Sequence, residues 1–86
     1  MKIWATLHKN HKIIKNATVS SDIEDPAYAL LACMEQVYKL FDLAEPVWVS
    51  KHAKDISQFG RTRFYADDFL EPINFDWFEI ESIPEE

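Results

Sequence analysis

The stretch SKHAKDISQFGRTRFYADDF, Ser50 to Phe69, gathers side chains whose types and spacing could do chemistry. It contains both arginines of the chain, Arg61 and Arg63, and its only glycine, Gly60. Guanidinium groups bind carboxylates and phosphates through paired N–H donors, and a nearby tyrosine offers an aromatic surface for stacking. The stretch therefore predicts either an anion-binding clamp or cross-strand ion pairs on a solvated face.

Strand pairing favours the ion-pair interpretation. Residues 61–67 alternate in polarity, so Arg61, Arg63 and Tyr65 share one face of a strand. An antiparallel partner at residues 75–81 satisfies charge, aromatic contact and burial in a single register. That register pairs Arg61 with Glu81, Arg63 with Glu79, Tyr65 with Trp77, Phe64 with Phe78, and Thr62 with Ile80. We expect ion pairs here, with anion or phosphate binding by Arg61 and Arg63 as the alternative.

Three histidines raise the question of a metal site. His8 and His11 form an HxxH pattern at a predicted hairpin tip, and His52 could supply a third imidazole for zinc. The chain has no HExxH motif and no cysteine cluster, which are stronger signatures of zinc. The pattern therefore predicts a solvated polar turn and no metal.

Four carboxylates crowd the segment that follows the arginines. Hard cations such as Ca²⁺ take oxygen ligands of this kind, but the spacing fits no EF-hand loop and no glycine allows a tight wrap. We expect a solvated acidic loop or partners for lysines of the N-terminal hairpin. An ion site or a general acid–base pair is the alternative. The four residues are Asp67, Asp68, Glu71 and Asp76.

Covalent and cofactor chemistry have little support in the sequence. Cys33 lies at the margin of an apolar helix stripe, where a buried, inert thiol is the ordinary expectation. A nucleophile would need a neighbouring base, and a chain with one glycine cannot build a glycine-rich phosphate loop. The sequence predicts a protein that is not an enzyme and carries no cofactor.

The first half of the chain reads as a hairpin and a long helix. Alternating polarity predicts strands at residues 2–8 and 12–20. The turn between them lacks Asn-Gly or Asp-Gly, which leaves its type open. An acidic cap at Asp25 and a proline at Pro26 predict the start of a helix that runs to about Leu43.

The second half alternates shorter elements. Val47–Val49 predicts a short strand at a sheet edge. Residues 51–59 predict a short helix, which Ser50 caps and Gly60 ends. Two strands and an acidic tail complete the chain, at residues 61–66, 75–83 and 84–86.

Together these elements predict one small α+β domain, residues 1–86, with the order ββαβ(α)ββ. An antiparallel or mixed sheet with the one long helix packed on one face would bury one side of the strands. Trp4 and Trp77 then fall on the other, more polar face. Tryptophans outside a core are enriched at protein interfaces, although the short helix could also cover that face.

The net charge of −6 conceals alternating blocks. Residues 1–20 carry four lysines and no acid, whereas residues 64–86 carry eight acids and no base. An acidic chain with a pI near 4.9 is a poor general binder of nucleic acid. The basic hairpin, with Trp4 for stacking, keeps a nucleic-acid-associated protein as an alternative. Its lysines are Lys2, Lys9, Lys12 and Lys15.

Nothing in the sequence predicts insertion into a membrane. The longest apolar run, AYALLACM, has eight residues, whereas a membrane-spanning helix needs about 20. No basic and apolar leader is visible at the N-terminus. We therefore expect a cytoplasmic protein.

The composition favours burial of a shared surface. Apolar residues make up 48% and aromatic residues 14% of the 86 residues, and so small a domain gains stability by association. We expect a non-enzymatic protein-interaction or regulatory module that forms a homodimer or binds a protein partner. The contact surface would be the aromatic-bearing sheet face or an edge strand. Its predicted binding residues are Trp4, Trp77, Tyr65, Arg61 and Arg63.

Overall fold

Four antiparallel strands and two helices make up residues 1–84, the part of the chain that the computed structural model describes. The strands form one sheet in the order β2-β1-β4-β3. A short 3-10 turn, η1, lies between the last two strands. The elements are β1 (Lys2–Lys9), β2 (Lys12–Ser20), α1 (Pro26–Phe41), α2 (Ser50–Phe59), β3 (Arg61–Phe64), η1 (Ala66–Asp68) and β4 (Trp77–Ile83).

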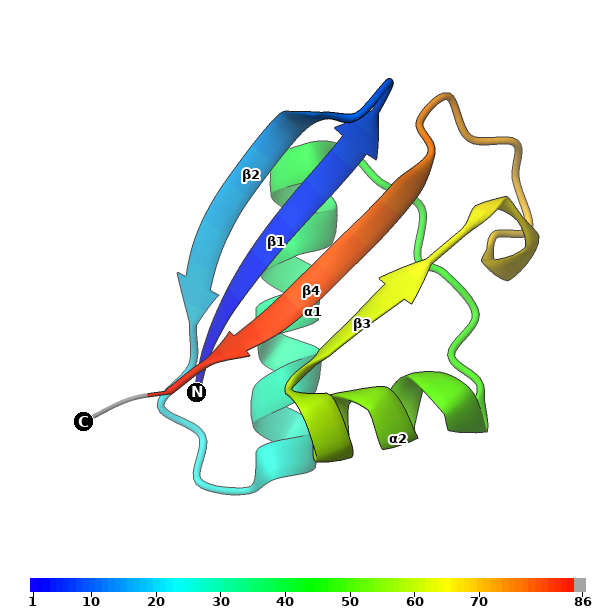
Figure 1. Ribbon diagram of the computed structural model, residues 1–86. Helices are drawn as coiled ribbons and strands as arrows, with labels where there is room; N and C mark the ends of the chain where they lie inside the picture. Colours follow the sequence, from blue (N-terminus) through cyan, green and yellow to red (C-terminus); the bar gives the residue numbers. More distant parts are fainter. Residues whose placement is uncertain (85–86) are drawn as a thin grey trace.

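The long helix α1 lies across one face of the sheet, and α2 lies beside the β3 edge (Figure 1). β1 and β4 are the central strands, so the two hairpins meet along an antiparallel seam. The small α+β fold with an antiparallel sheet is thus confirmed. The register predicted for the second hairpin is confirmed as well, because Arg61 lies opposite Glu81 and Phe64 lies opposite Phe78.

Strand alternation buries the face of the sheet that contacts α1. Each large apolar side chain that is fully buried contributes about 1.5–3 kcal/mol to stability. The burial of Cys33 agrees with the prediction of a buried thiol. The apolar residues exposed by no more than 1% are Ile3, Ala5, Phe64, Phe78 and Ile80 on the strands, and Ala29, Cys33, Met34 and Val37 on α1.

Local hydrogen bonds fix both ends of α1. The Asp25 carboxylate accepts hydrogen bonds from two N–H groups of the first turn, at 2.9 and 3.3 Å, and Pro26 is the first helical residue. The helix ends at Phe41 rather than near Leu43, because Asp42 adopts a left-handed conformation with a φ of 51°.

No helix within residues 1–84 is both long and apolar enough to cross a membrane.

The strand predicted at Val47–Val49 does not form, so residues 1–84 follow the order ββααββ with four strands. The Val47 N–H donates to the Asp68 carbonyl oxygen at 2.7 Å, but no ladder continues from this bond in the described chain. Trp48 instead packs edge-on against the buried Phe64 ring, with centroids 5.0 Å apart. The segment therefore packs its indole against Phe64 and does not pair at a sheet edge.

The start of α2 also differs from the prediction. The Val49 N–H donates to Nδ1 of His52 at 3.0 Å, so a residue inside the first turn provides the cap predicted for Ser50. The end of α2 is as predicted, because Gly60 closes it with a φ of 72°.

The β1–β2 turn has two central residues with positive φ, Asn10 at 53° and His11 at 63°. Lys9 and Lys12 pair on either side of them. This is the type I′ pattern, whose twist suits a two-residue hairpin. The Asn10 N–H donates to Oδ2 of Asp76 at 2.9 Å, which ties the turn to the β3–β4 connection.

Replacing His11 by glycine is expected to stabilise the protein by about 0.5 kcal/mol. A β-carbon at a φ of 63° is strained, whereas glycine adopts this conformation freely. Urea denaturation measures the change. Lys12→Gly, in ordinary strand conformation, is the control and should destabilise. A less stable His11→Gly protein would contradict the prediction.

Candidate functional site

One face of the sheet points away from α1 and is called here the open face (Figure 1). The short helix α2 does not cover it, because α2 contacts the opposite, buried side of β3. Asp55 accepts a hydrogen bond from the Thr62 hydroxyl at 3.1 Å. His52 stacks on the buried Phe64 with centroids 4.3 Å apart. The alternative in which the short helix covers this face is therefore wrong.

Strand register arranges the open face in three rows that span all four strands, and a fourth row of Ile83, Lys2 and Ser20 lies at the end of β4, β1 and β2. From β3 to β2, the three full rows are Tyr65, Trp77, His8 and Ile13; Arg63, Glu79, Thr6 and Asn16; and Arg61, Glu81, Trp4 and Thr18. The structure therefore places all five predicted binding residues on one face.

Trp77 lies within a cluster of rings on the open face. Its indole stacks on the His8 imidazole, with centroids 4.6 Å apart and an interplanar angle of 16°. The Arg63 guanidinium carbon lies 4.8 Å from the indole centroid, and the Tyr65 ring lies 6.4 Å away. A hydrogen bond of 2.8 Å between His8 Nε2 and the Thr6 hydroxyl holds the imidazole. These contacts hold the rings of the cluster in fixed positions relative to one another.

Trp77 also carries an unsatisfied polar group. Its indole N–H is buried and has no hydrogen-bond acceptor within residues 1–84. A buried donor left without an acceptor costs about 1–3 kcal/mol. The rings packed around Trp77 therefore bury this donor at a cost in stability.

Arg63 makes the ion pair that the register predicts. Its Nε donates to Oε1 of Glu79 at 2.6 Å. Interactions with Tyr65 and Glu79 raise the pKa of Arg63, so the guanidinium keeps its charge. Arg63 thus links β3 to β4 while its planar group covers Trp77.

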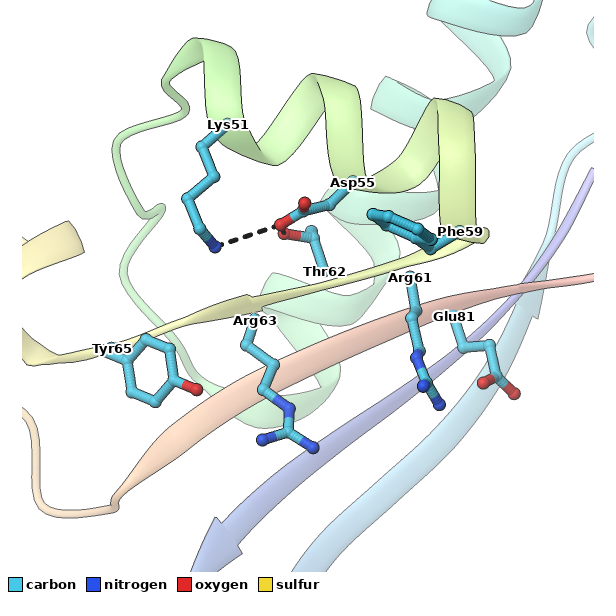
Figure 2. Close-up of a pocket in the computed structure, with 8 residues that line it drawn as sticks. All are labelled: Lys51, Asp55, Phe59, Arg61, Thr62, Arg63, Tyr65 and Glu81. Carbon is cyan, nitrogen blue, oxygen red and sulfur yellow. Dashed lines mark hydrogen bonds and ion pairs between the residues drawn. The ribbon is translucent and has the colours of Figure 1, made fainter.

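Arg61 behaves differently from Arg63. It lies opposite Glu81, but no ion pair joins it to any carboxylate in the described part of the chain. Arg61 and Glu81 are therefore neighbours on adjacent strands, as predicted, but they do not form the predicted salt bridge. Arg61 instead lines a groove of about 460 Å³ beside the β3 edge (Figure 2).

The helix α2 forms the second wall of this groove. Lys51, Asp55 and Phe59 are spaced four residues apart and face β3 (Figure 2). Lys51 Nζ donates to Oδ2 of Asp55 at 3.1 Å. The remaining lining residues come from the sheet side and are Arg61, Thr62, Arg63, Tyr65 and Glu81.

Titration of Asp55 is expected to make part of the stability sensitive to acid. The hydrogen bond from Lys51, with a smaller one from Thr62, holds the pKa of Asp55 below its ordinary value of 3.8. A lowered folded-state pKa stabilises the fold above the ordinary value, and this stabilisation is lost as the pH falls through the folded-state pKa. Asp55→Asn should therefore lower the melting temperature at neutral pH and much less at about pH 3.

The control for this prediction is Asp67→Asn, which changes an exposed acid outside the groove. It should leave the melting temperature nearly unchanged at both pH values. An equal effect of Asp55→Asn at neutral and acid pH would contradict the role given to its charge.

The three histidines lie apart. His8 belongs to β1 and stacks on Trp77, so its assignment to a solvated turn is wrong. His11 is exposed in the turn, whereas His52 is buried on α2. Within residues 1–84, no group of three or more His, Cys, Asp or Glu side chains is placed to hold a metal ion.

Two of the predicted loop acids form local hydrogen bonds. Asp68 Oδ2 accepts the Tyr65 N–H at 2.8 Å and lies 3.5 Å from Nε2 of His52. Asp76 binds the N–H of Asn10 in the β1–β2 turn. These carboxylates thus hold the chain connections in place. Asp67 and Glu71 are exposed and form no hydrogen bond or ion pair within residues 1–84.

The lysines of the N-terminal hairpin are dispersed. Lys9 and Lys12 flank the turn, whereas Lys2 lies at the opposite end of β1. Lys15 Nζ donates to the Phe41 carbonyl oxygen at the end of α1, at 3.3 Å. The four lysines therefore do not form one basic surface around the open face.

The contact of His8 with Trp77 and the α2 wall of the groove are site features that the sequence analysis did not predict. The even spacing of Trp4 and His8 signals a shared strand face. The four-residue spacing of Lys51 and Asp55 signals a shared helix face. The position of that helix beside β3 depends on the turn at Gly60, which no side-chain pattern reveals.

Comparison with known proteins found no family model, no curated protein and no solved structure with significant similarity to this chain.

Proposed function

We propose that this chain is a non-enzymatic protein-interaction module and that a second copy of the chain is its partner. The open face carries this proposal, because neither helix covers it and it presents Trp4, Trp77 and Tyr65. Aromatic residues are enriched at the cores of interfaces. Two-fold dimers are the commonest protein oligomers.

The strand order supports a face-to-face pair in which like charges stay apart. With a two-fold axis along the strands between β1 and β4, β3 of one copy faces β2 of the other. Arg61 then meets the uncharged Thr18 of the second copy, and Arg63 meets the uncharged Asn16. Such an arrangement avoids repulsion between arginines.

The size of the open face limits the area that such a dimer can bury. A strand spacing of about 4.8 Å and a rise of about 3.3 Å per residue give this face a flat area of roughly 450 Å². A standard interface buries about 800 Å² per partner. We therefore expect a weak dimer with a Kd in the micromolar range.

The chemistry of the open face supports binding rather than catalysis. Thr6, whose hydroxyl bonds His8, is a residue only 1% exposed, so it lies out of reach of a substrate. Glu79 is engaged by Arg63. These polar groups stabilise one another and the rings around them.

Sedimentation equilibrium from low to high micromolar concentration tests the proposal. The expected result is an average mass that rises from the 10.1 kDa of one chain towards twice that mass. A species of 10.1 kDa at every concentration would overturn the homodimer.

A further inference from the structure

The outer edge of β3 presents main-chain groups that no strand uses. β3 is the last strand of the sheet, and its preceding residue Gly60 accepts the Ser82 N–H at 2.6 Å. Hydrogen bonding alternates along an antiparallel ladder. Thr62 therefore turns its main-chain groups towards β4, whereas Arg61 and Arg63 direct theirs towards the free edge.

The groove beside this edge combines three kinds of binding group. The free strand edge supplies hydrogen-bond donors and acceptors. Phe59 supplies an apolar surface and is 68% exposed. Arg61 supplies a guanidinium group that pairs with no carboxylate in residues 1–84. In Figure 2, Phe59 and Arg61 lie on opposite sides of the β3 ribbon.

We propose that this groove binds an extended peptide segment, which pairs with β3 as an additional strand. Peptides that add to a sheet edge gain affinity from main-chain hydrogen bonds and specificity from alternate side chains. Side chains on one side of the segment would contact the exposed Phe59 ring and are apolar. Those on the other side would lie beside Arg61 and Arg63 and are acidic.

The pairing on the inner edge of β3 supports this choice of partner chemistry. There β3 binds residues 78–81, FEIE, in which apolar side chains enter the core and glutamates lie beside the arginines. Arg63 engages one of these glutamates, and Arg61 remains available for a carboxylate from the outer side. A segment at the outer edge would therefore repeat the acidic and apolar alternation of β4.

The other edge of the sheet lacks these features. β2 carries Lys12 and Lys15, and its pairing with β1 contains a bulge next to Leu7 and His8. Lysines and bulges hinder the addition of a strand to an edge. No helix lies beside the outer edge of β2 to form a groove (Figure 1).

Fluorescence anisotropy with a labelled peptide of alternating glutamate and valine tests the side-chain chemistry. We expect micromolar binding of this peptide and none of a peptide of alternating lysine and valine. Arg61→Ala should weaken binding about tenfold, as expected for the loss of a charge-assisted hydrogen bond. Lys12→Ala, which removes a charge at the hairpin turn, should leave the affinity unchanged. Equal binding of both peptides would overturn the proposal.

A pair of variants at Arg63 tests strand addition itself. Arg63→Ala removes only the side chain, whereas Arg63→Pro also removes an outward N–H without breaking a bond to β4. We expect Arg63→Pro to bind about tenfold more weakly than Arg63→Ala, and equal affinities would overturn strand addition. If the proline variant does not fold, the readout is hydrogen exchange of the Arg61 and Arg63 amides in the wild type. Peptide must then protect both amides, and unprotected amides would overturn the pairing.

Two further measurements separate this groove from other sites. Binding of inorganic phosphate at Arg61 without any binding of the glutamate peptide would assign the groove to a small anion and overturn the proposal. Trp4 lies on the open face outside the groove lining. Trp4→Ala should therefore weaken self-association and preserve peptide binding, which distinguishes failure of the dimer from failure of the groove.

Discussion

Replacing His52 by alanine is expected to lower the free energy of unfolding by about 3 kcal/mol. The imidazole is 2% exposed and stacks on Phe64, so its removal leaves a cavity in the core. Its Nδ1 also accepts the Val49 N–H, and alanine would leave that donor without its cap. The cavity accounts for about 2 kcal/mol and the cap for about 1 kcal/mol.

Thermal unfolding followed by circular dichroism measures this effect. A loss of about 3 kcal/mol corresponds to a fall of roughly 12–24 °C in the melting temperature of a domain this small. His11→Ala is the matched control, because that histidine is exposed in a turn, and it should shift the melting temperature little. A His52→Ala protein that melts like the wild type would refute the packing and capping roles of the ring.

Truncating both tryptophans of the open face is expected to weaken self-association about a thousandfold. Trp4 and Trp77 lie on β1 and β4, the two central strands of the proposed interface. A two-fold dimer loses each truncated indole twice, so a loss of about 1 kcal/mol per indole removes about 4 kcal/mol in all. Together these losses move a micromolar dimer into the millimolar range. Sedimentation equilibrium of the Trp4→Ala, Trp77→Ala double variant measures the change.

The control for this variant lies on the outer side of α1. Leu31 is 54% exposed there and Tyr28 is 65% exposed, so α1 offers a second apolar surface. Leu31→Ala should leave the dimer intact. Loss of the dimer in Leu31→Ala, with retention in the double tryptophan variant, would move the interface to α1.

The register of the second hairpin could be predicted because several preferences agree on it. The alignment that pairs Arg63 with Glu79 also places Phe64 against Phe78, and a shift by one residue would reverse every face. The start of α1 could be predicted from a single local rule, the carboxylate cap at Asp25. Where the side chains of neighbouring residues alone determine an element, the sequence pattern is enough to predict that element.

The segment Val47–Val49 could not be predicted because its structure depends on distant residues. β-branched residues favour strands, but strand propensity depends strongly on context and does not show whether a sheet edge is within reach. Here the Trp48 ring packs against Phe64, a residue on β3 that is distant in the sequence. The cap from His52 was equally hidden, because histidine is not among the usual capping residues.

The candidate site shows the same division. Alternate residues of a strand lie on the same face, and this alternation can be recognised in the sequence. The sequence analysis therefore correctly placed Arg61, Arg63 and Tyr65 on a common face. Whether that face is covered depends on the direction in which the chain leaves α2. Gly60, with a φ of 72°, directs β3 so that α2 stays on the buried side. Exposure of the open face is therefore a property of the tertiary structure.

An amide NMR dilution series of the wild type tests most directly whether two copies associate through the open face. On dilution from high to low micromolar concentration, we expect the amide signals of Trp4, Thr6 and Trp77 to shift. The signals of Tyr28 and Leu31 on the outer side of α1 should stay constant. Shifts confined to α1, or spectra that do not change with concentration, would contradict association through this face.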